Sequence, residues 1–87
     1  MTGADAQGGF GPFASSIRGE LVAVQEASIH GDLYYDLTAR TDAANNRGVK
    51  VRAPSHACRQ APRVGQRVRI ELLMGQVTSV VVESEGA

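Results

Sequence analysis

The residues of this sequence best suited to chemistry are cations grouped in its middle third. Residues 40–69 carry eight basic side chains and one acid, Asp42, a net charge of +7, while the remaining residues carry −7. Seven of these eight basic residues are arginine, whose planar guanidinium forms paired hydrogen bonds with phosphate. A surface built only for solubility mixes both signs, so this segregation indicates a phosphate-binding face.

An aromatic ring accompanies these cations. Residues 33–40 alternate between apolar and polar types, which is the period of a half-buried strand. The alternation places Tyr34 outside and Tyr35 inside, whereas a shift of one residue would exchange them. An exposed ring flanked by cations can stack a nucleobase while the cations contact phosphates.

The neighbouring strands supply the cations of this predicted face. If residues 33–40 and 49–52 form a hairpin, Arg40, Lys50 and Arg52 share its outer face, and Arg47 lies on the loop between them. Arg67 and Arg69 alternate with apolar residues and point outward from a later strand. The predicted nucleic-acid-binding residues are Tyr34, Arg40, Arg47, Lys50, Arg52, Arg67 and Arg69.

Five predicted strands must position these side chains. They cover approximately residues 15–25, 33–40, 49–52, 67–72 and 76–83, with a loop over 26–32 and a bend or bulge at Gly19. Ser55 is placed to cap a short helix that Pro62 ends. The sequence therefore predicts an all-β domain over residues 15–83, with a short helix between strands three and four and flexible tails over 1–14 and 84–87.

This order resembles the OB-fold (oligonucleotide-binding fold), a five-stranded Greek-key barrel. The local match is Pro62-Arg63-Val64-Gly65-Gln66-Arg67-Val68-Arg69-Ile70, which looks like the entry into strand four of many OB domains, although SH3-like barrels use similar turns. Size, strand count and charge are also similar to the single-stranded-DNA-binding proteins of filamentous phages. The resemblance implies oligonucleotide binding across strands two and three and the adjoining loops.

We therefore expect a single-stranded nucleic-acid-binding protein that is largely independent of sequence, with DNA as the first ligand and RNA as the second. Zero net charge and a single outward aromatic ring leave an alternative, a protein-interaction or assembly module. That module would use its charged faces and the exposed edge of a valine-rich last strand. A core this small favours homodimerisation as an additional source of stability.

The sequence gives little support for enzymatic or metal-binding functions. The chain has no nucleophile motif and no phosphate-binding glycine loop, and His56 and Cys58 are spaced too closely to share one helix face, so we expect no enzyme. These two residues, with His30 and Met74, are soft-metal ligand types, but they lack the spacing of a structural zinc site. We expect no metal or cofactor, no membrane span, no signal peptide and a cytoplasmic location.

Overall fold

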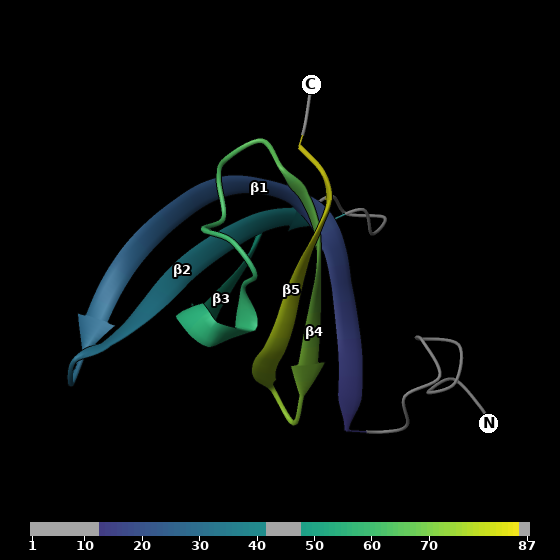
Figure 1. Ribbon diagram of the computed structural model, residues 1–87. Coiled ribbons are helices and arrows are strands. Elements are labelled where there is room, and N and C mark those ends of the chain that lie inside the picture. The colour runs from purple at the N-terminus through teal and green to yellow at the C-terminus, as the bar shows by residue number, and fades with distance from the viewer. Residues whose placement is uncertain (1–12, 42–47, 86–87) are drawn as a thin grey trace.

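The structure, a computed structural model, describes residues 13–41 and 48–85. Its five strands confirm the predicted all-β class (Figure 1). The elements are β1 (Ala14–Ile29), β2 (Asp32–Thr41), β3 (Gly48–Pro54), the 3-10 turn η1 (Ser55–Ala57), β4 (Arg67–Leu73) and β5 (Gln76–Ser84). Most of the two predicted tails lies outside the described residues. No helix in the described part is long and apolar enough to cross a membrane.

All five strands belong to one sheet with the order β3-β2-β1-β4-β5, and each neighbouring pair is antiparallel. The sheet curls, so that its two edge strands, β3 and β5, come into contact (Figure 1). Within the described residues no ladder joins these edges, and an isolated parallel bridge links Cys58 to Val80 just after β3 ends. The predicted barrel is therefore confirmed only in part, because the sheet stays open between β3 and β5. We call this opening the β3–β5 seam.

The helix expected between strands three and four is wrong, since the segment forms only the 3-10 turn η1 (Ser55–Ala57). Pro54 precedes this turn in an extended conformation, and no side chain caps it. Cys58 has already returned to extended backbone, with φ −110° and ψ 124°. The segment between Pro54 and Pro62 is too short for a stable helix without a cap, because helix nucleation is costly.

The loop expected over residues 26–32 is also wrong, because β1 continues to Ile29 and pairs with β2 up to a two-residue turn. His30 and Gly31 form this turn with φ of 53° and 85°. Met74 and Gly75 connect β4 to β5 in the same way, with φ of 53° and 83°. Positive φ at both central residues is the pattern of the type I′ turn, which suits the twist of paired strands.

A bend in β1 joins the two halves of the sheet. Residues 14–20 pair with β4 and residues 19–29 pair with β2, and the β1–β2 register shifts between Leu21 and Ala23. The amide of Leu21 donates to the carbonyl of Gln66, and the amide of Gly65 donates to the carbonyl of Leu21, each at 2.8 Å. The segment before β4 thus satisfies the backbone that the bulge leaves unpaired.

Gly19 lies at this bend, where a side chain has no space. A Cβ atom on Gly19 would overlap the carbonyl oxygen of Arg40 on β2 and lie 2.8 Å from its carbonyl carbon. The obstacle is backbone, which cannot move aside as a flexible side chain can. Absence of a Cβ is therefore required for β1 to run this close to β2.

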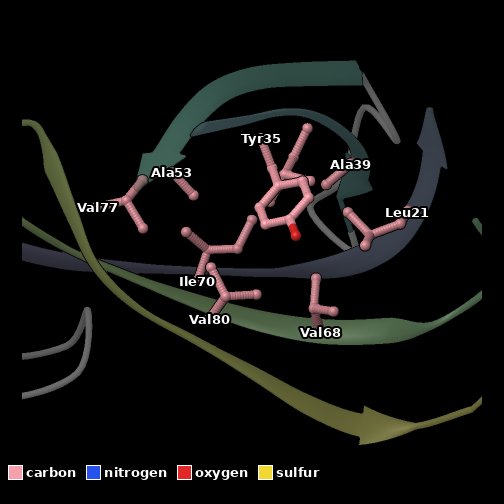
Figure 2. Packing of buried hydrophobic residues seen from close by; sticks show 9 residues of the cluster. Leu21, Tyr35, Ala39, Ala53, Val68, Ile70, Val77 and Val80 are labelled. Atoms are coloured by element: carbon pink, nitrogen blue, oxygen red, sulfur yellow. The ribbon is translucent and has the colours of Figure 1, made fainter. Parts of the chain in front are cut away.

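The core fills the concave side of the curled sheet with mainly aliphatic side chains (Figure 2). Leu21, Leu37, Val68 and Ile70 are almost fully buried and come from three strands. The complete cluster is Leu21, Tyr35, Leu37, Ala39, Ala53, Val68, Ile70, Val77 and Val80. Each strand contributes to it, so the two halves of the sheet are held together by a shared core.

Replacing Gly19 with alanine should lower the free energy of unfolding by about 2–3 kcal/mol, since the backbone must shift to admit the methyl group. Urea unfolding followed by circular dichroism measures this. Gly48→Ala is the matched control, because its Cβ would meet only a side-chain methyl of Thr38 at 3.6 Å. Equal effects of the two substitutions would contradict the close approach at Gly19.

Met74→Asn should raise the free energy of unfolding by about 0.5–1 kcal/mol, because asparagine tolerates the left-handed backbone better than methionine. His30→Asn should act in the same direction. Met74 is 73% exposed, so replacing its side chain costs little packing. Met74→Leu keeps the unfavourable backbone and should give no gain in thermal or urea unfolding.

Candidate nucleic-acid interface

The outer face of β2 and β3 carries the predicted stacking residue. Tyr35 points into the core and is 7% exposed, whereas Tyr34 lies on the opposite face and is half-buried, so the predicted alternation is confirmed. Tyr34 pairs in register with Pro54, Asp36 with Arg52, and Thr38 with Lys50. This register places Arg52 diagonally across from Tyr34, within reach of long side chains.

A groove of about 860 Å³ lies beside this face, where the β3–β5 seam is open. One wall comes from β2, β3 and η1, and the other comes from the turn between β4 and β5 and the first residues of β5. The polar lining includes Tyr34, Lys50, Arg52, His56, Gln76 and Thr78. The volume lies in the range of ligand-binding clefts. We call this feature the seam groove.

The structure brings together three of the seven predicted residues, Tyr34, Lys50 and Arg52, in the lining of the seam groove. Arg40 lies six residues further along β2, about 20 Å from Tyr34 at the rise of a strand. Arg67 and Arg69 lie on β4, which is separated from β2 by β1. Arg47 lies outside the described residues. The predicted site is therefore smaller than the basic segment that suggested it.

An acid lies within this cationic group. Arg52 donates from Nε to Asp36 Oδ1 at 2.7 Å and from Nη2 to Asp36 Oδ2 at 3.0 Å, a bidentate ion pair between β3 and β2. These hydrogen bonds hold the pKa of Asp36 below its ordinary value, and the nearby charge of Lys50 acts in the same direction. Asp36 is therefore ionised at neutral pH. Lys50 itself makes no ion pair with any described residue.

Further ion pairs neutralise cations outside the groove. Arg18 and Arg69 are direct partners across β1 and β4, and Glu83 on β5 accepts from both, at 3.2 and 3.0 Å. Arg69 also donates to Glu71 at 3.1 Å. The two segments that are oppositely charged in the sequence are thus interleaved on the surface. Arg69 is engaged by two acids and is a weaker phosphate ligand than its position in the sequence indicated.

A second polar cluster fastens the segment that leads into β4. Gln66 is buried, and its Oε1 accepts from the amide of Arg63 at 2.9 Å while its Nε2 donates to Glu85 at 2.9 Å. Glu85 also accepts from Arg63 at 2.7 Å and from Gln60 at 3.2 Å, and the hydrogen bonds from Gln66, Arg63 and Gln60 lower the pKa of Glu85. Arg63 is therefore occupied by a structural role.

Sequence reasoning did not assign His56, Gln76 or the apolar rim of the groove to this site. His56 enters through η1, and Gln76 enters through the turn between β4 and β5, which the curl of the sheet brings opposite β3. Leu73 is 51% exposed at this rim. Period-two patterning assigns a residue to a face of its own strand but does not show which two edges meet, so no signal in the sequence placed these residues together.

Metal and thiol chemistry gain no support from the arrangement. No group of three or more His, Cys, Asp or Glu side chains is clustered within residues 13–41 and 48–85. Burial raises the pKa of the Cys58 thiol, and its Sγ lies 4.0 Å from the carbonyl oxygen of Pro54. A raised pKa reduces the thiolate fraction that nucleophilic attack or metal binding requires.

Comparison of the chain with protein-family models, with curated proteins and with solved structures found no match.

The ion pair at the groove makes a testable prediction about titration. In a carbon-detected NMR titration, Asp36 should titrate below its ordinary value of 3.8, and Arg52→Gln should raise this pKa more than Lys50→Gln does. Because the folded pKa is depressed, the pair stabilises the fold above that ordinary value and loses its contribution as pH falls through the folded pKa. An Asp36 pKa that is unchanged by Arg52→Gln would show that the pair does not persist in solution.

Proposed function

We propose that this chain is an OB-like domain that binds single-stranded nucleic acid in the seam groove, largely without sequence preference and without a catalytic step. The observation that carries the proposal is the convergence of Tyr34, Lys50, Arg52 and His56 on one groove. Five strands in a curled sheet, with β1 shared between two halves, support the OB-like assignment. DNA is the first ligand to test and RNA the second.

The residues of the seam groove would make different contacts with a bound nucleic acid. A base that stacks on the Tyr34 ring gains about 1–3 kcal/mol, and this contribution is tolerant of sequence because every base has an aromatic face. Lys50 and Arg52 face the same groove and supply donors to phosphate oxygens. Exposed Leu73 at the rim adds apolar surface for bases or sugars. Few cations take part, so we expect moderate affinity.

Titration of fluorescent oligo-dT and oligo-rU at several salt concentrations tests the proposal. Binding should weaken as salt rises, because phosphate contacts release counterions. Tyr34→Ala should weaken binding by about 1–3 kcal/mol through lost stacking. Lys50→Ala should weaken it and flatten the salt dependence.

Arg59→Ala is the matched control for Lys50→Ala. It removes one exposed positive charge from a residue that lines a different hollow, beside β5 and the segment after η1. Its effect should be smaller than that of Lys50→Ala. No binding at low salt, or binding that Tyr34→Ala leaves unchanged, would overturn the proposal.

A second candidate, a protein-interaction or assembly module, has one specific observation in its favour. The edges of β3 and β5 have no ladder between them within the described residues, and Phe13, Leu73 and Met74 are exposed apolar side chains. Unpaired edges and apolar surface both promote association of chains. Size-exclusion chromatography at low and high salt distinguishes the candidates, since an oligomer that binds no oligonucleotide favours assembly.

A further inference from the structure

The acid in the middle of the proposed binding face has a consequence for affinity. Asp36 occupies the outer face of β2 between Tyr34 and Thr38 and lies directly opposite Arg52 on β3. It also lines a hollow of about 610 Å³ on the outer face of β1, β2 and β3. Lys50 and Arg52 line both this hollow and the seam groove. A nucleic-acid strand that passes from the seam groove onto the outer face of β2 and β3 therefore meets Asp36.

The geometry of the ion pair determines what Arg52 can still offer. Asp36 takes the Nε–Nη2 edge of the guanidinium in a bidentate arrangement, the same arrangement that a phosphate would take. The Nη1 group makes no hydrogen bond to a described residue. Side-chain exposures of 52% for Arg52 and 43% for Asp36 leave the pair accessible to a ligand. Arg52 can therefore contact phosphate, but its charge is already balanced.

We propose that Asp36 limits the affinity of the seam groove for the phosphate backbone by holding Arg52 in an internal ion pair. The inference rests on the proposed function. A neutral pair exerts little attraction beyond a Debye length, which is about 8 Å at physiological ionic strength. Lys50, for which no ion pair with the described residues is found, then supplies most of the salt-dependent attraction in the groove.

The Asp36–Arg52 ion pair also determines which contacts contribute most of the binding free energy. A face with one balanced arginine, and one lysine that has no ion pair among residues 13–41 and 48–85, attracts polyanions weakly at long range. Bound nucleic-acid strands are then retained mainly by base stacking on Tyr34 and by other short-range contacts. These contacts are less sensitive to salt. Asp36 thus favours rapid, reversible binding of unpaired bases over indiscriminate binding of any polyanion, including duplex DNA and heparin, whose attraction is largely electrostatic.

The test is Asp36→Asn, which removes one negative charge and keeps one carbonyl oxygen that can accept from Arg52. Affinity for oligo-dT at low salt should rise about threefold to tenfold, as expected for removing a like charge close to a phosphate. The plot of log affinity against log salt should steepen by about 0.7, the contribution of one further phosphate contact on a single strand. Heparin should compete more effectively with the variant than with the unmodified chain.

Glu83→Gln is the matched control. It makes the same change of charge in an acid that also pairs with arginines, Arg18 and Arg69, but it lies at the opposite end of β5 from the groove. It should raise affinity much less than Asp36→Asn. Arg52→Ala should weaken binding in both backgrounds, because it removes one positive charge in each. The loss should be larger in the Asp36→Asn background, where the guanidinium is free to contact phosphate, and a double-mutant cycle measures the difference.

The outcomes separate this inference from the proposed function. Unfolding curves establish first that Asp36→Asn is folded, and Asp36→Glu, which retains the charge, should bind like the unmodified chain. If the unmodified chain binds oligo-dT and Asp36→Asn binds equally or more weakly, the inference fails and the proposed function stands. If neither protein binds at low salt, both fail.

Discussion

The bend of β1 is the constraint on which the rest of the structure depends. One strand must pair with β4 through its first half and with β2 through its second, and both ladders include Gly19 and Glu20. That overlap is possible because Gly19 has no Cβ to collide with the backbone of Arg40. The bulge after Leu21 then redirects the strand, and Gly65 and Gln66 satisfy the exposed backbone. Without this bend β3 and β5 would not meet, and the seam groove would not form.

The same curvature of the sheet brings segments of opposite charge next to each other. The sequence separates basic and acidic residues into different segments, but the sheet alternates between those segments, since β1 and β5 flank the basic strand β4. Asp36 and Glu83 consequently face arginines on neighbouring strands, while Glu71 pairs with Arg69 on its own strand. Exposed pairs of this kind contribute little to stability, because water and salt screen them. Their larger effect is to reduce the field of the arginines toward a ligand.

The sequence predicted the strands well and the connections poorly. Alternation located β2 and β4 almost to the residue and oriented Tyr34 and Tyr35 correctly, because one buried face enforces the period. The alternation did not extend β1 to Ile29. Residues Glu26–Ile29 belong to the part of the β1–β2 hairpin that lies beyond the core, and none of them is buried, so no apolar face marks them as a strand. A serine before a polar stretch suggested a helix where the flanking prolines leave only η1.

The candidate site was predicted in its centre and missed at its margins. Tyr34, Lys50 and Arg52 follow from hairpin register, which is local information. The second wall of the groove depends on two strands from opposite edges of the sheet that meet only after the chain curls. The ion pairs of Arg52 and Arg69 depend on register and rotamer together, so a count of charges overstates the cations that a ligand meets.

The division of β1 between two partners also orders the events of folding. Its pairing with β2 closes across two residues, a local step of the kind that forms within microseconds. Its pairing with β4 joins residues about fifty positions apart, and chain entropy delays such contacts. The hairpin of β1 and β2 can therefore exist before the core does, with Leu21 and Leu37 exposed until β4 arrives. We therefore expect the slow event in folding to be the pairing of β4 with the free edge of β1, whose other edge is already paired with β2.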